Sequence, residues 1–86
     1  MDNNIIYEHI IKSLYKMLCW REEEKHWLTI YDELLKEIAF SPMINDEIKG
    51  TLVLKITTLK FVDFRNFRTT IFEAINYVQS LQGISR

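Results

Sequence analysis

Apolar side chains recur every three or four positions along most of the chain, which is the spacing of one helix face. In the first quarter of the chain, two such stripes lie side by side after Asn3 or Asn4, either of which can cap a helix. A surface helix needs only one stripe toward a core, so the second must meet another helix, another subunit or a partner protein. The first stripe is Ile6, Ile10, Leu14 and Met17; the second is Tyr7, Ile11, Tyr15 and Leu18.

A second amphipathic helix is predicted from the acidic run at residues 22–24 to Phe40. Glutamates suit the positive end of a helix dipole, and we expect a bend at Trp20 before them. Ser41 precedes Pro42, and a residue before proline is pushed away from helical angles, so the helix should end there and residues 41–46 should form a loop. The apolar face consists of Trp27, Ile30, Tyr31, Leu34, Leu35 and Ile38.

Residues 47–62 carry conflicting signals. Apolar residues continue at helical spacing after a start signal at Asn45 or Asp46, but Gly50 and the neighbouring threonines and valines favour extended structure. We predict a helix, because a lone strand would find no convincing second strand and two-stranded hairpins are marginal in water. The alternative is an α+β fold with a short hairpin in residues 50–62.

A final helix is predicted to begin at Asp63, a good capping residue, and to end at Gly83, where glycine can adopt a left-handed closing conformation. The fold class is therefore all-α: a small three- or four-helix antiparallel bundle that forms a single helical domain over residues 1–86. A chain of this length has no room for a second core. The apolar face of the last helix is Phe64, Phe67, Ile71, Ala74, Ile75, Val78 and Leu81.

Charge is divided unevenly along the chain. Ten of the twelve acidic side chains lie between Asp2 and Glu47, so this part carries −5, the remainder carries +4, and the whole chain carries −1. Such patches steer encounters and partner choice. The apolar stretches are interrupted by basic residues and fall short of the roughly 20 residues that span a bilayer, so we expect no membrane partner.

Cysteine use and the start of the chain bear on location. The single cysteine, Cys19, rules out an internal disulfide framework and favours a reducing compartment, so we expect a cytoplasmic protein. Asp2 stands where a secretory signal would carry a basic residue, and we expect no export signal.

The chain contains residue types that can act in catalysis, but the partner residues that a catalytic or metal site requires are not found at suitable spacing. Glu22 and His26 are four apart and would share a helix face, but a zinc site needs about four ligands, or three plus water. Cys19 has no assignable base and is interpreted as a small core side chain. The only glycines are Gly50 and Gly83, which excludes a glycine-rich phosphate loop. We therefore expect no catalytic residues, no metal and no cofactor.

The chain has eleven aromatic residues, more large apolar side chains than a solitary small domain needs. We expect a non-enzymatic protein-interaction module of the adaptor, inhibitor, immunity or chaperone type, an analogy at the level of fold that no motif narrows. The partner is another protein, of basic character where it meets the acidic residues, or a second copy that pairs the two charged halves head to tail. The candidate contact residues are Tyr7, Ile11, Tyr15, Trp20, Glu33 and Glu37.

The alternative function is a small nucleic-acid-binding regulator. Phe64 and Phe67 lie among arginines, and aromatic rings can stack on bases while arginines contact phosphates. We favour core packing for these rings, because the chain as a whole is slightly acidic. The candidate nucleic-acid contacts are Lys55, Lys60, Arg65 and Arg68 in the basic half.

Overall fold

The helical spacing of apolar residues produces four α-helices in the computed structural model, which describes residues 4–84. This result confirms the all-α prediction. Within residues 4–84 there is no strand, so the alternative of a hairpin in residues 50–62 is wrong. The elements are α1 (Asn4–Cys19), α2 (Glu24–Phe40), α3 (Asp46–Thr57), a 3-10 turn η1 (Thr58–Lys60) and α4 (Phe64–Ile84).

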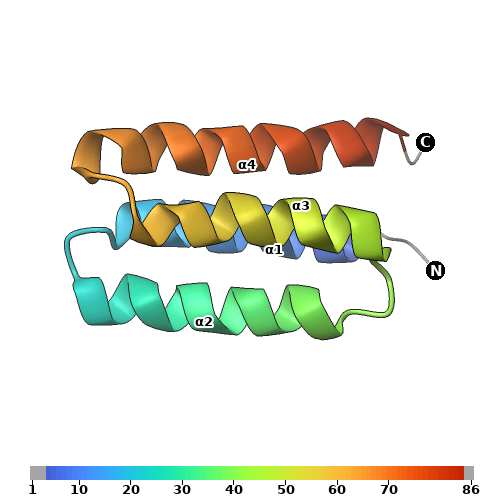
Figure 1. Cartoon of the computed structure of the whole chain (residues 1–86), viewed down its shortest axis with the longest axis horizontal. Coiled ribbons are helices and arrows are strands. Elements are labelled where there is room, and N and C mark those ends of the chain that lie inside the picture. Colours follow the sequence, from blue (N-terminus) through green and yellow to red (C-terminus); the bar gives the residue numbers. More distant parts are fainter. Residues whose placement is uncertain (1–3, 85–86) are drawn as a thin grey trace.

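The four helices run alternately up and down and form an antiparallel bundle (Figure 1). Each helix packs against the next one in sequence, and α4 packs back against α1. As a result α2 and α4 occupy diagonally opposite corners of the bundle, with α1 and α3 at the other two. The α1–α2 turn and the α3–α4 connection share one end, whereas the α2–α3 loop lies at the other, where α1 begins and α4 ends.

One apolar core fills the space between the helices, and every helix contributes to it. Fully burying a side chain of this kind stabilises the fold by roughly 1.5–3 kcal/mol before the entropy of ordering it is counted. The predicted face of the last helix is buried, except that Phe64 is 64% exposed, because it opens α4 at the end of the bundle. The most deeply buried side chains include Ile10, Leu14, Met17, Leu34, Ile38, Leu52, Ile56, Phe67, Ile71 and Val78.

The threonines that favoured a strand are accommodated in α3 and the turn after it. The hydroxyl of Thr57 donates to the carbonyl oxygen of Val53 at 2.8 Å, and that of Thr58 donates to Leu54 at the same distance. Each bond reaches back four residues along the helix, so the short polar side chain is satisfied locally. Burial of Leu52 and Ile56 then outweighs the strand propensity of these residues.

Local signals set three of the helix ends: the starts of α3 and α4 and the end of α2. The side-chain oxygen of Asn45 accepts from the N–H of Ile48 at 2.9 Å, and that of Asp63 accepts from Asn66 at 2.8 Å. Ser41, before Pro42, closes α2 with an extended backbone, as predicted. Asn3 lies outside the described residues.

The predicted end of α4 is wrong. Gly83 has no positive φ, and the helix continues through it to Ile84. Glycine permits the left-handed conformation without requiring it, so a glycine near the end of a helical pattern does not by itself stop the helix.

Candidate interaction surface

The α1–α2 turn and the α3–α4 connection lie at the same end of the bundle (Figure 1). Three large apolar side chains in or beside these connections are exposed. Trp20 is 42% exposed, Phe61 85% and Phe64 64%. We call this surface the aromatic end. Other exposed apolar side chains lie elsewhere, with Ile5 and Phe40 near the opposite end and Leu54 on α3.

Backbone hydrogen bonds order the chain at Trp20 and Phe61. The N–H of Trp20 donates to the carbonyl of Lys16 at 3.0 Å, and its ring lies 4.3 Å from the ring of His26 between centroids. Phe61 follows η1 directly, and its N–H donates to the carbonyl of Thr58 at 3.0 Å. Large apolar side chains that stay exposed at one end of a domain forgo the stabilisation that burial would give, which is typical of a surface that a partner covers.

Arg21 ties the α1–α2 turn to the start of α4. Its guanidinium carbon lies 4.8 Å from the ring centroid of Phe67, 5.4 Å from that of Trp27 and 5.6 Å from that of Phe64. The Nε of Arg21 and the Nε1 of Trp27 are buried without a hydrogen-bond partner among residues 4–84. The half-buried arginine is therefore held by the faces of the rings rather than by a carboxylate.

Opposite charges flank the aromatic end. Glu22, Glu23 and Glu24 are exposed where α2 begins, and Arg65 and Arg68 are exposed where α4 begins. Within the described part of the chain the one contact at ion-pair distance joins the imidazole of His9 and the carboxylate of Glu37, on the side of the bundle between α1 and α2. The glutamates and arginines at the aromatic end thus form no ion pair with one another or with any other residue in 4–84. The guanidinium of Arg68 instead lies 5.5 Å from the ring centroid of Phe72.

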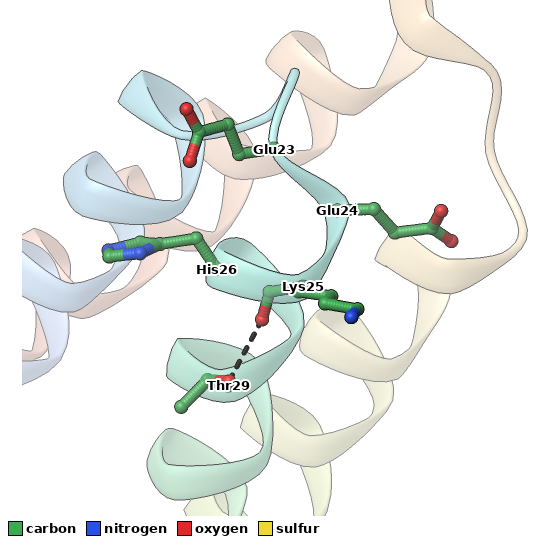
Figure 2. A pocket seen from close by; sticks show the side chains of 5 residues that line it. All are labelled: Glu23, Glu24, Lys25, His26 and Thr29. Atoms are coloured by element: carbon green, nitrogen blue, oxygen red, sulfur yellow. Dashed lines mark hydrogen bonds between the residues drawn. The ribbon is translucent and has the colours of Figure 1, made fainter.

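A shallow, open depression lies at the start of α2 (Figure 2). Its side chains do not converge: the carboxylate of Glu24 extends away from the imidazole of His26. The hydroxyl of Thr29 is already used, since it donates to the carbonyl of Lys25 at 2.8 Å. Side chains that point apart cannot act together on one substrate group. The depression is lined by Glu23, Glu24, Lys25, His26 and Thr29.

Two expectations about chemistry-bearing residues are wrong. Glu22 lies in the turn before α2, so it does not share a helix face with His26. Cys19 is exposed rather than a core side chain, because it ends α1 on the side that faces solvent. In the described part of the chain no group of three or more histidine, cysteine or acidic residues is placed to hold a metal ion.

Tyr7 is a core residue and not a surface contact, since it is only 3% exposed. The first stripe of α1 faces the core, since Ile10, Leu14 and Met17 are buried. Tyr7 is the one buried residue of the second stripe. Ile6 and Ile11, from different stripes, are both half-buried. Burial raises the pKa of the Tyr7 hydroxyl above its ordinary value of 10.0, and Tyr77 adds to the effect.

The remaining candidate contacts do not form one surface. The ring of Tyr15, 43% exposed, packs edge-on against Phe72 of α4 at 6.1 Å between centroids. Glu37 pairs with His9 and therefore lies on the opposite side of α1. Ile11 and Tyr15 lie on the α4 side of α1. Glu33 and Glu37 belong to α2 and lie on the other side. Trp20 is at the aromatic end.

The candidate nucleic-acid contacts are also dispersed. The ammonium of Lys55 lies 5.5 Å from the ring centroid of Tyr77, on the border between α3 and α4. The ammonium of Lys60 lies 4.8 Å from the ring centroid of Tyr31 and so extends toward α2. Arg65 and Arg68 lie in the first two turns of α4, and the guanidinium of Arg68 extends over the ring of Phe72.

Sequence reasoning missed Phe61 and the ring contacts of Arg21. Phe61 falls outside every apolar stripe and stands two residues before the capping Asp63, a position that a helix connection seldom gives to an aromatic side chain. That mismatch is the signal that could have identified it. The contacts of Arg21 depend on how α4 docks, which no local pattern reports.

None of the helices in residues 4–84 combines the length and the apolar character needed to cross a bilayer. Comparison of the chain with known proteins gave no significant match to a protein family, to a curated protein or to a solved structure.

Proposed function

We propose that the protein is a non-enzymatic protein-interaction module that binds a partner protein through the aromatic end. The observation that supports this proposal is the exposure of Phe61 and Phe64 on a backbone that is otherwise well packed. Aromatic residues supply much of the binding energy at protein interfaces, because they bury large apolar areas at low entropic cost. The acidic and basic groups that flank these rings would set the orientation of the partner.

The test is partner binding by surface variants. The protein is immobilised, bound proteins are identified by mass spectrometry, and the affinity for an identified partner is measured by calorimetry. The variants Phe61→Ser and Phe64→Ser should each weaken binding by a factor of about 10 or more, which is the size of effect expected at an interface hot spot.

Phe40→Ser is the matched control, because Phe40 is 82% exposed but lies at the opposite end of the bundle. This variant should bind as tightly as the wild-type protein. Wild-type affinity in both Phe61→Ser and Phe64→Ser would refute the proposal, and loss of binding in Phe40→Ser would place the interface at the other end.

A second candidate function is nucleic-acid binding by the same surface. It is favoured by the exposed ring of Phe64 beside Arg65 and Arg68, since rings can stack on bases while guanidiniums contact phosphates. A fluorescently labelled single-stranded oligonucleotide tests this function by anisotropy. Binding that falls steeply between about 0.05 and about 0.2 M salt and is lost in Arg65→Ala would favour it over protein binding.

The exposed thiol of Cys19 supports a cytoplasmic location for this activity. In an oxidising compartment an exposed free cysteine would form intermolecular disulfides, whereas a reducing compartment keeps it free.

A further inference from the structure

We infer that the aromatic end binds a second copy of this chain, end to end, about a two-fold axis. This inference rests on the proposed function and specifies its partner. It follows from where the opposite charges lie relative to one another.

The two charged groups occupy diagonally opposite corners of the aromatic end. Glu22, Glu23 and Glu24 form the acidic corner, at the start of α2. Arg65 and Arg68 form the basic corner, in the first two turns of α4, with Arg65 nearer the end of the bundle and the guanidinium of Arg68 over the ring of Phe72. Because α2 and α4 each pack between α1 and α3 and not against each other, the two corners face across the diagonal of the bundle (Figure 1).

A two-fold axis along the other diagonal, from α1 to α3, makes this surface complementary to itself. Rotation about that axis exchanges the α2 and α4 corners, so the acidic corner of each copy lies over the basic corner of the other. The contact is thus formed twice, as in any two-fold symmetric interface. Trp20 directly follows α1, and Phe61 follows α3 and its 3-10 turn, so both lie near the axis, where each faces its own counterpart.

The same arrangement disfavours a partner of uniform charge. A purely basic partner would suit the acidic corner but would be repelled by Arg65 and Arg68, and a purely acidic partner would meet the reverse problem. The guanidinium of Arg21, beside Phe64, adds positive charge on the side of the basic corner. The carboxylate of Asp63, which caps α4, offsets part of this positive charge.

The size of the surface predicts a weak dimer. The bundle measures 36 × 21 × 19 Å, so its end offers about 400 Å² per copy, well below the roughly 800 Å² per partner of a standard interface. A dissociation constant on the order of 100 µM is expected, with strong dependence on salt because the corner charges are exposed.

Sedimentation velocity of the full chain tests the inference. The weight-average mass should rise from monomer toward dimer between about 10 µM and about 1 mM protein. Raising the salt from about 0.05 M to about 0.5 M should shift the equilibrium back toward monomer.

Charge reversal gives the sharper test. One variant, Glu22→Lys with Glu23→Lys, makes both corners basic; another, Arg65→Glu with Arg68→Glu, makes both acidic. Each variant alone should remain monomeric, because like charges then meet twice across the axis. Mixed in equal amounts, the two should form a one-to-one heterodimer, because opposite charges then meet at both corners, as they do in the wild-type dimer.

Lys36→Glu is the matched control, since Lys36 is exposed on α2 away from the aromatic end. It should dimerise as the wild-type protein does, and circular dichroism should show the same helicity in every variant. The inference is overturned if the wild-type chain stays monomeric throughout, or if each charge-reversed variant dimerises alone.

Failure of the dimer inference can be distinguished from failure of the proposed function. If the chain does not dimerise but Phe61→Ser and Phe64→Ser lose affinity for a different protein, the inference of a second copy is wrong while the proposed function stands. If those variants keep wild-type affinity for every partner and wild-type self-association, the aromatic end has no binding role and both proposals are wrong.

Discussion

Arg21 occupies a position where a side chain of its kind is normally paired with an acid. Its guanidinium lies against three aromatic rings, and no carboxylate within residues 4–84 forms an ion pair with it. Replacing it by alanine removes the cation–π contacts and the packing of its stem. We expect Arg21→Ala to lower the free energy of unfolding by about 1–2 kcal/mol, measured by urea denaturation.

Lys25→Ala serves as the control for the loss of a positive charge nearby, since Lys25 is exposed on the first turn of α2. Its free energy of unfolding should stay within about 0.5 kcal/mol of the wild-type value. Equal effects of the two substitutions would mean that the contacts between Arg21 and the rings contribute nothing measurable.

The buried tyrosines give the fold a dependence on alkaline pH. Burial raises the pKa of Tyr7, with a contribution from Tyr77, and burial also raises the pKa of Tyr31, with a contribution from Asp32. A phenol whose pKa is higher in the folded than in the unfolded state binds its proton more tightly when folded. Its contribution is therefore fully present below about pH 10 and is lost as the pH rises through the folded-state pKa.

We accordingly expect the thermal unfolding midpoint to fall as the pH is raised above about 10, and to fall less steeply in Tyr7→Phe and Tyr31→Phe. Circular dichroism at several pH values measures the midpoint. At neutral pH the midpoint of each variant supplies the baseline, so that any packing change is separated from the titration. A wild-type slope in both variants would contradict the assignment to these hydroxyls.

At the level of single residues, the sequence identified which side chains are apolar better than it identified which are buried. Tyr7 was predicted to contact a partner and lies in the core, whereas Phe64 was predicted to lie in the core and is exposed. Both errors have the same physical origin. Helical periodicity shows which side chains share a face, but the docking of neighbouring helices decides where burial begins and ends.

At the level of elements, α3 is the helix whose sequence agrees least with its structure. Gly50 lies inside α3 with an ordinary right-handed backbone, and a Cβ added there would meet nothing within 4 Å. Alanine loses less conformational entropy on folding than glycine does. We therefore expect Gly50→Ala to raise the free energy of unfolding by roughly 0.5–1 kcal/mol, measured by urea denaturation.

Gly50→Val distinguishes a helix from a strand at the same position. In a helix valine should stabilise less than alanine, because its branched side chain loses rotamer freedom. In a strand the order would be reversed, since valine is favoured there and alanine is not. Greater stability of Gly50→Val than of Gly50→Ala would therefore contradict a helical α3.

Helix boundaries could be predicted wherever the signal is local. Asn45 and Asp63 accept hydrogen bonds from first-turn amides, and Pro42 restricts the residue before it, so each acts through its immediate neighbours. Gly83, by contrast, permits the left-handed backbone that ends many helices but does not require it. The difference explains why the beginnings of α3 and α4 were predicted correctly and the end of α4 was not.

For the whole molecule, short connections between amphipathic helices were enough to predict an antiparallel bundle. The candidate site could not be predicted in the same way. Its residues come from the α1–α2 turn and the α3–α4 connection, which are distant in sequence and are brought to one end only by helix packing. The sequence shows that acidic residues prevail in the first part of the chain and basic residues in the rest, but it does not show which of these residues lie close together in the folded bundle. Glu22 and Arg65 are 43 positions apart in sequence yet belong to the same end of the bundle.

Truncating Phe64 and truncating Phe67 should have very different effects on the free energy of unfolding. The two phenylalanines lie three residues apart on α4, but Phe67 is fully buried and Phe64 is 64% exposed. Truncating a buried phenylalanine costs about 3–5 kcal/mol, a large part of the roughly 4–13 kcal/mol expected for a domain of this size. We expect Phe67→Ala to be close to unfolding at room temperature, as thermal and urea denaturation would show.

Phe64→Ala should lower the free energy of unfolding by no more than about 1 kcal/mol, because that change removes chiefly the contact with Arg21. The folded variant can then be assayed for self-association and partner binding without a loss of structure to confuse the result. If Phe64→Ala destabilised the protein as much as Phe67→Ala, Phe64 would belong to the core, and the aromatic end would be a stabilising feature of the fold rather than a surface for binding.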